Sequence, residues 1–185
     1  QLLDTFNATA LPYPDDRTLQ SLIEAQVLAG PDRIAAVHRE RRITYAELDR
    51  EAGRLARRLR AMGVGRGHFV GILDERGLDF LTAMVAILKA GAAFIPIDPG
   101  YPEERVRHMV SDSAVAVLIT RSTVLKRFTL KGEAGAALQH FVLLDEHTDD
   151  VTEVVAATEA GSLRRTRARM DSGCGARSHS ALTSQ

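Results

Sequence analysis

The segment from residue 88 to residue 113, LKAGAAFIPIDPGYPEERVRHMVSDS, constrains the fold most, because it holds a helix end, a strand, a turn and a second helix. Lys89 suits the last turn of a helix, and Gly91 can end that helix in the left-handed conformation. Residues 92–97 are almost wholly apolar, which predicts a strand covered on both faces. Pro96 cannot donate a backbone hydrogen bond, so it predicts a sheet edge or a strand end.

Two prolines then redirect the chain. Residues 98–100, Asp-Pro-Gly, predict a turn, in which Asp98 hydrogen-bonds its own backbone. Pro102 suits the first turn of a helix, and the acidic residues 103–104 favour the positive end of that helix. The apolar face of this helix consists of Val106, Met109 and Val110.

This segment resembles the second core motif of the adenylation domains of nonribosomal peptide synthetases, in the superfamily of acyl-adenylate-forming ligases. Residues 43–48, ITYAEL, resemble the first core motif of the same domains. Residues 6–9 and 12–14, FNAT and PYP, resemble the stretch that links a condensation domain to an adenylation domain. Phe6 stands where a tryptophan is common in that stretch. The resemblance extends from about residue 2 to residue 153.

The resemblance implies an α/β fold, with a largely parallel sheet and helices on both faces, forming the first part of the large N-terminal subdomain. It implies a cytoplasmic enzyme that activates an amino-acid carboxylate with ATP and Mg²⁺ and releases pyrophosphate. The acyl group would then pass to the phosphopantetheine thiol of a downstream carrier domain. The other implied partner is an upstream condensation domain, and neither nucleic acid nor a membrane is implied.

The composition fits a globular protein. Of the 185 residues, 45% are apolar and 26% are charged, and the formal net charge is zero, so bulk electrostatics favours no polyanionic partner. Cys174 is the single cysteine, which excludes an internal disulfide and agrees with a reducing cytoplasm. No apolar run approaches the ~20 residues that cross a bilayer. Because the chain begins with Gln1, we expect a fragment or a processed product.

Periodicity predicts the elements that precede the central segment. Asp16 or Thr18 can cap a short helix, which Gly30 and Pro31 stop. A strand over residues 34–38 and a charged turn over 39–42 follow. The apolar face of the short helix is Leu19, Leu22, Ile23 and Val27.

Thr44 and Glu47 have the spacing of a capping box, which predicts a helix that Gly63 closes. A short strand is predicted over 69–73 and a buried helix over 78–90. The apolar stripe of the first of these helices is Tyr45, Leu48, Ala52, Leu55, Ala56, Leu59 and Met62.

Two more aliphatic strands are predicted, over residues 114–119 and 141–144. Strands without polar alternation, separated by helices, favour parallel pairing in a sheet that is covered on both faces. Right-handed crossovers then determine how the chain winds.

The character of the chain changes near residue 156, and we divide it into a linker (1–15), a partial adenylation domain (16–155) and a disordered tail outside the family (156–185). The tail is rich in arginine, serine and glycine and lacks apolar periodicity. The family's phosphate-binding loop, which ends in lysine, is expected there. Residues 172–175, SGCG, resemble it only weakly, and no lysine follows Lys131.

Other patterns favour structural interpretations. The glycines of residues 63–67 follow a helix and precede a strand, the reverse of a dinucleotide fingerprint. Cys174 in the tail is interpreted as incidental. The arginines at 50, 54, 57, 58 and 60 alternate with acidic residues and predict a solvated helix face. The histidines lack metal-ligand spacing; they are His38, His68, His108, His140, His147 and His179.

The sequence therefore nominates no catalytic, cofactor-binding or metal-ligating residue, and we expect this chain alone not to adenylate. Two alternatives stay open: a non-catalytic truncated or frameshifted product, and a fragment of another aryl- or acyl-CoA ligase. A sheet cut partway leaves a strand edge and an apolar face uncovered, so we expect marginal stability and a tendency to aggregate.

Overall fold

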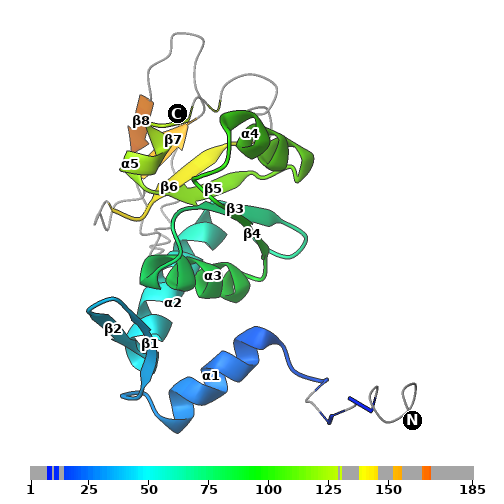
Figure 1. Ribbon diagram of the computed structural model, residues 1–185, viewed down its shortest axis with the longest axis vertical. Helices are drawn as coiled ribbons and strands as arrows, with labels where there is room; N and C mark the ends of the chain where they lie inside the picture. The colour runs from blue at the N-terminus through cyan, green and yellow to red at the C-terminus, as the bar shows by residue number, and fades with distance from the viewer. Residues whose placement is uncertain are drawn as a thin grey trace, which may run out of the picture.

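The computed structural model describes residues 8–9, 11–12, 15–128, 130, 138–145, 152–155 and 164–167. Its centre is a four-stranded parallel sheet in the order β4-β3-β5-β6. Figure 1 shows α2 and α3 on one side of this sheet and α4 on the other. The predicted α/β class, with helices on both faces of a parallel sheet, is confirmed. The strands are β3 (Phe69–Leu73), β4 (Ala93–Ile97), β5 (Val117–Thr120) and β6 (His140–Leu143).

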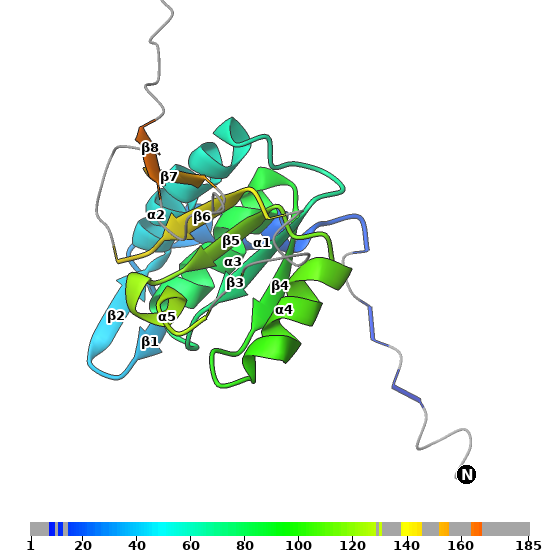
Figure 2. The same ribbon diagram turned by 90° about the horizontal axis from the view of Figure 1, so that it is seen from above.

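The order of the strands makes the sheet doubly wound. The helix α3 (Leu78–Ala90) connects β3 to β4, and α4 (Glu103–Asp112) connects β4 to β5 on the other side of β3. Right-handed crossovers that run in opposite directions place their helices on opposite faces of a sheet. Figure 2 shows the four strands side by side, with β4 and β6 in the outer positions.

Each face of the sheet has its own apolar core. On one face, Val70 and Ile72 of β3 pack with α3 and with α2 (Tyr45–Ala61). On the other face, Leu73 and Leu118 pack with Val106 and Val110 of α4. The alternation of side chains along β3 therefore supplies both cores.

The predicted capping box at the start of α2 is confirmed. The backbone N–H of Thr44 donates to Oε2 of Glu47 at 2.8 Å, and the N–H of Glu47 donates to Oγ1 of Thr44 at 3.2 Å. Four residues of the predicted apolar stripe, Leu48, Ala52, Ala56 and Leu59, are buried, and the other three are half-buried.

The charged turn predicted over residues 39–42 was wrong in extent. Arg41–Thr44 forms a strand, β2, that pairs antiparallel with β1 (Ile34–His38). Only Arg39, with a φ of 57°, and Glu40 make the turn. The charges of Arg41 and Arg42 suggested a turn, but both are exposed residues of a strand whose buried residue is Ile43.

Pro96 predicted a sheet edge or a strand end, and the edge is what the structure has, because β4 is an outer strand of the described sheet. The predicted cover on both faces is present but incomplete. Phe94 packs against one core, and Ile95 and Ile97 pack in the other, whereas Ala93 and Pro96 are exposed. The strand predicted from residue 114 begins later, at Val117, because Ala114 with a φ of 47° still belongs to the turn that ends α4.

Four further elements complete the described chain. The helix α1 (Leu19–Ala29) is capped by Thr18, and α5 (Ser122–Leu125) follows β5. The strand β7 (Thr152–Val155) pairs antiparallel with β8 (Arg164–Arg167) in a separate sheet. Thus four residues of the predicted disordered tail form a strand, and the rest of residues 156–185 lie outside the described residues. None of the described helices is long and apolar enough to span a bilayer.

Candidate functional site

The edge of the sheet at the carboxyl ends of its strands carries a group of charged side chains. Asp74 directly follows β3, and Arg121 directly follows β5. Because the chain leaves β3 towards β4 on one side and returns to β5 on the other, this is the switch point of the doubly wound sheet. Ligands of open α/β sheets commonly bind at such a point, so we take this edge as the candidate site.

Arg121 and Asp74 form the inner pair of this edge. Nε of Arg121 donates to both carboxylate oxygens of Asp74, at 3.1 Å and 3.0 Å. The side chain of Asp74 is only 2% exposed, whereas that of Arg121 is 33% exposed. Burial raises the pKa of Asp74, and the nearby guanidinium of Arg121 opposes that rise.

Asp79, in the first turn of α3, is the outer acceptor. It accepts from the guanidinium of Arg121 and, at 3.4 Å, from both terminal nitrogens of Arg41 on β2. Burial alone raises the pKa of Asp79, but the donors of Arg121 and Arg41 outweigh it and hold the pKa below its ordinary value. The network thus connects the β1–β2 hairpin, α3, β3 and β5.

Two further contacts fasten neighbouring strand ends. Oγ1 of Thr120 donates to the backbone oxygen of Leu73 at 2.7 Å, which links β5 to β3. The backbone N–H and Oγ of Ser122 donate to the carboxylate of Asp145, at 3.0 Å and 2.5 Å, which links the start of α5 to the end of β6. These bonds hold the pKa of Asp145 below its ordinary value, although burial acts in the opposite direction.

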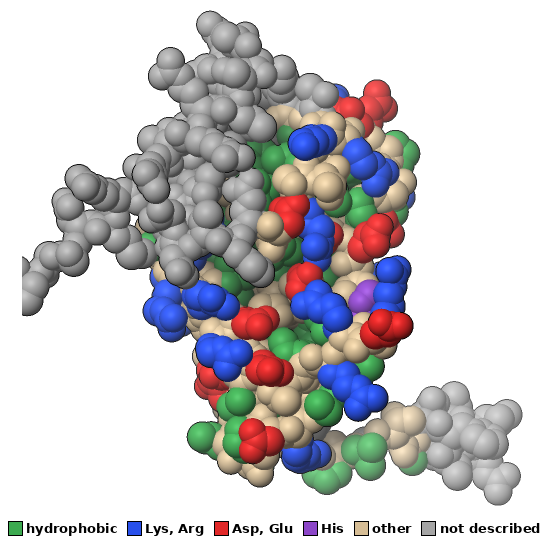
Figure 3. Space-filling model, turned by 90° about the vertical axis from the view of Figure 1, so that its left-hand side faces the viewer, with side chains coloured by type: hydrophobic (Ala, Val, Ile, Leu, Met, Phe, Trp, Pro, Cys, Tyr) green, Lys and Arg blue, Asp and Glu red, His purple; other side chains and the backbone are tan. Residues whose placement is uncertain are grey.

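Carboxylates already bind both guanidinium groups at this edge. Arg41 pairs with Asp79, and Arg121 pairs with Asp74 and Asp79. Within the described part of the chain, no three His, Cys, Asp or Glu side chains are grouped to hold a metal ion. Figure 3 shows acidic and basic side chains interleaved on the side of the molecule where α5 lies. The arrangement therefore orders strand ends.

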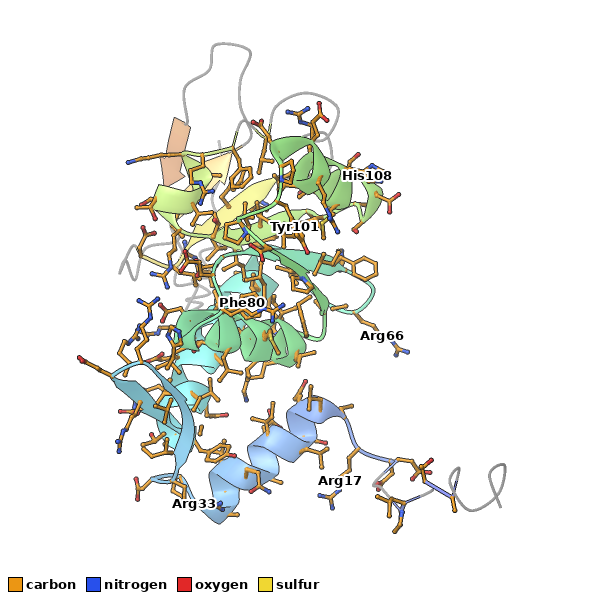
Figure 4. All side chains as sticks on the ribbon, in the orientation of Figure 1. Arg17, Arg33, Arg66, Phe80, Tyr101 and His108 are labelled. Atoms are coloured by element: carbon orange, nitrogen blue, oxygen red, sulfur yellow. The ribbon has the colours of Figure 1, made fainter. Side chains whose placement is uncertain are left out.

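The structural interpretations of two sequence patterns are confirmed. Oδ1 of Asp98 accepts from the backbone N–H of Gly100 at 2.7 Å, so this carboxylate stabilises its own turn. Residues 63–67 connect α2 to β3, with Gly63 and Gly67 at φ values of 83° and 86°. Arg66 in this loop points away from the sheet (Figure 4).

Most of the arginines predicted on a solvated face of α2 are exposed, and three of the four described histidines are exposed as well. On α2 the arginines at 50, 54, 57 and 60 are exposed, and Arg58 is half-buried. Figure 4 shows His108 on the outer side of α4. His38 and His68 are exposed as well, and His140 is half-buried at the start of β6. His147, His179, Cys174 and residues 172–175 lie outside the described residues.

Sequence reasoning missed all four members of the charged network. A signal was present, because Asp74 and Arg121 each directly follow an apolar strand. Carboxyl ends of parallel strands meet at one edge of a sheet, so charged residues at those positions are candidates for mutual contact. The contact also requires β3 and β5 to be neighbours, which periodicity alone does not specify.

Comparisons with known proteins agree with this fold. The model of the family described as AMP-binding enzyme matches residues 23–174. Tyrocidine synthase 3 of Brevibacillus parabrevis is 45% identical over 125 residues, which are 68% of this chain and 2% of that protein. Gramicidin S synthase 2 of Brevibacillus brevis is 43% identical over 127 residues, which are 69% of this chain and 3% of that protein. The chain thus spans only a few per cent of these relatives' length.

Two solved structures share the architecture. The nonribosomal peptide synthetase FmoA3 in its AMPPNP-bound form gives a TM-score of 0.66 at 33% identity, over 75% of this chain and 14% of that chain. The N-terminal subdomain of Klebsiella oxytoca NpsA gives 0.58 at 25% identity, over 69% of this chain and 32% of that chain. The chain therefore belongs to the AMP-binding enzyme family, in which it resembles the first part of the N-terminal subdomain of nonribosomal peptide synthetase adenylation domains.

Proposed function

We propose that this chain is the N-terminal part of an amino-acid-activating adenylation domain of nonribosomal peptide biosynthesis. The observation that carries the proposal is the doubly wound parallel sheet, with order β4-β3-β5-β6, shared at 33% identity with a peptide synthetase structure that binds AMPPNP. The peptide synthetases among the similar proteins favour this proposal over a fragment of an aryl- or acyl-CoA ligase.

In the proposed reaction a carboxylate oxygen of the amino acid attacks the α-phosphorus of ATP, and the bond to pyrophosphate breaks. The products are an aminoacyl-adenylate and pyrophosphate. The thiolate of a carrier-bound phosphopantetheine then attacks the acyl carbon, and AMP leaves. Catalysis requires the poor nucleophile to lie in line with the α-phosphorus while the charge of pyrophosphate is neutralised.

We propose that this chain contributes the scaffold of that site rather than its reacting groups. The described cations at the sheet edge are bound by Asp74 and Asp79, so no step of the reaction is assigned to them. Their contribution is to hold the carboxyl ends of β3 and β5 in fixed register, from which later parts of a complete domain can be positioned. No catalytic or ligand-binding residue is therefore proposed in this chain.

The remaining partners and boundaries are proposals of the same kind. ATP with Mg²⁺ and an amino acid would be bound by the complete domain, in the cytoplasm, between an upstream condensation domain and a downstream carrier domain. We propose residues 1–15 as the linker, 16–155 as the partial adenylation domain and 156–185 as the tail. The family match over residues 23–174 supports the middle segment and also enters the tail.

Pyrophosphate exchange, measured with each of the twenty amino acids, tests the proposal. The purified chain is expected to give no amino-acid-dependent exchange. A graft, in which residues 16–145 replace the matching segment of an adenylation domain of tyrocidine synthase 3, is expected to exchange. Exchange by the chain alone would refute its assignment as an incomplete domain, and a folded but inactive graft would favour the non-catalytic alternative.

A further inference from the structure

The helix α1 is attached to the rest of the molecule by few apolar contacts. None of its residues is buried, and Leu19 and Leu28 are 55% and 87% exposed. Its Ile23 packs against the core cluster between α2, α3 and the sheet, without being buried itself. Figure 1 shows α1 beyond α2 and α3, on their side away from the sheet. Hydrophobic burial therefore contributes less to the docking of α1 than to that of α2 or α3.

Lys89, in the last turn of α3, connects this helix to two others. Its Nζ lies 2.9 Å from Oε1 of Glu24 on α1 and 2.9 Å from Oδ1 of Asp49 on α2. The side chain of Lys89 is 14% exposed, and those of Glu24 and Asp49 are 43% and 37% exposed. One ammonium group is thus shared by two carboxylates at the junction of three helices.

The environment of Lys89 favours its charged form. Burial lowers the pKa of this lysine, but the bonds that its ammonium group donates to Glu24 and Asp49 outweigh the burial and raise the pKa above its ordinary value. The pair with Asp49 joins α3 to α2, which already share a buried apolar interface. The pair with Glu24 is different, because it joins the core to a helix that has no buried side chain.

We propose that Lys89 is an electrostatic latch that docks α1, so that α1 can detach as a unit while α2, α3 and the sheet stay folded. The described residues 15–18, which directly precede α1, extend away from the rest of the molecule in Figure 1. The latch therefore determines the position and direction of that segment. This inference concerns the described fold and is independent of the proposed function.

Hydrogen exchange of the whole chain, followed by mass spectrometry, tests the latch. Glu24→Gln removes the α1 carboxylate and leaves the Lys89–Asp49 pair intact. Exchange in the peptide covering α1 is expected to accelerate about three- to tenfold, whereas the peptides covering α2 and α3 keep their rates. Lys89→Met is expected to accelerate α1 at least as much. Lys126→Met, at an exposed lysine after α5, is the matched control and leaves α1 unchanged.

Ionic strength provides a second measurement that needs no folded Lys89 variant. Raising NaCl from about 0.05 M to about 1 M shortens the screening length to about 3 Å, so α1 exchange should accelerate in the unmodified chain. The same increase in NaCl should have little effect on α1 exchange in the Glu24→Gln variant. Unchanged α1 exchange in Glu24→Gln would overturn the latch. Equal acceleration of α1, α2 and α3 would also overturn it, because the three helices would then open together.

Discussion

Arg121 donates from Nε to both carboxylate oxygens of Asp74, although the two residues are 47 positions apart in the sequence. They meet because β3 and β5 are parallel neighbours whose carboxyl ends coincide. Asp74 is almost wholly buried, and Arg121 also reaches Asp79 on α3. Arg121 therefore links the ends of β3 and β5 to α3, the helix that covers one face of the sheet.

Replacing Arg121 is predicted to destabilise the fold. Arg121→Met leaves the buried carboxylate of Asp74 without its cation, and we expect a loss of about 2–4 kcal/mol in the free energy of unfolding. Urea unfolding followed by circular dichroism measures this loss. Arg54→Met, at an exposed arginine of α2, should change the free energy by less than about 0.5 kcal/mol.

A double variant separates the lost pair from a general packing defect. Asp74→Leu combined with Arg121→Met leaves no unpaired charge at the site, so it should lose less stability than Arg121→Met alone. Additive losses from the two substitutions would show that the two side chains act independently, contrary to the geometry.

The two carboxyl groups that Arg121 contacts are predicted to titrate on opposite sides of the ordinary pKa of 3.8. The pKa of Asp79 is lowered, so its stabilisation is present above the unfolded-state pKa and is lost as the pH falls through the folded value. The pKa of Asp74 is raised, so the folded state holds a proton longer, and this contribution is lost as the pH rises to the folded value.

Carboxyl ¹³C shifts followed from pH 7 to pH 2 measure both groups. As the pH falls, we expect Asp74 to become protonated before Asp79. In unfolding experiments, Asp79→Asn should reduce the loss of stability below about pH 4. A pKa of Asp79 higher than the pKa of Asp74 would contradict the contacts described for these two carboxyl groups.

A contact could be predicted from the sequence when its residues are close together along the chain. Thr44 and Glu47 are three residues apart, so their spacing alone predicted the capping box. Pro96 has no backbone N–H to donate, and it therefore predicted a sheet edge or a strand end. The network of Arg121 could not be predicted in the same way, because its partners come from β2, β3 and α3 and depend on the order of the strands.

Adding a side chain at Gly71 is predicted to reduce the stability of the fold. A Cβ at this position in β3 would lie 2.6 Å from Cδ1 of Leu118 and 3.3 Å from Cγ1 of Val115, both in a packed core. We expect Gly71→Ala to reduce the free energy of unfolding by about 1–3 kcal/mol. Gly65→Ala is the control, since a Cβ there meets nothing within 4 Å. Equal effects of both substitutions would contradict the packing.

The N-cap of α2 is predicted to contribute measurably to stability. Thr44→Ala removes the oxygen that accepts from the backbone N–H of Glu47 and should cost about 1 kcal/mol. Thr44→Ser keeps that oxygen and should retain most of the stability. Thermal melting of both variants provides the comparison, and equal melting temperatures for them would contradict the role of the hydroxyl.

The hairpin and β4 show where local patterns were insufficient. Arg41 and Arg42 predicted a turn because both are charged, yet both are exposed residues of a strand that pairs with β1. Residues 92–97 are apolar and predicted full cover on both faces, yet β4 is an outer strand in which Ala93 and Pro96 are exposed. In both cases the missing information was which neighbour the strand has.

The graft of residues 16–145 into an adenylation domain of tyrocidine synthase 3 tests the central claim most directly, through amino-acid-dependent exchange of pyrophosphate. A small displacement of a scaffold can cost about 100-fold in rate, so we predict exchange within about two orders of magnitude of the parent domain, with the amino acid of the parent. A graft that melts cooperatively but shows no exchange above the background without amino acid would contradict the account.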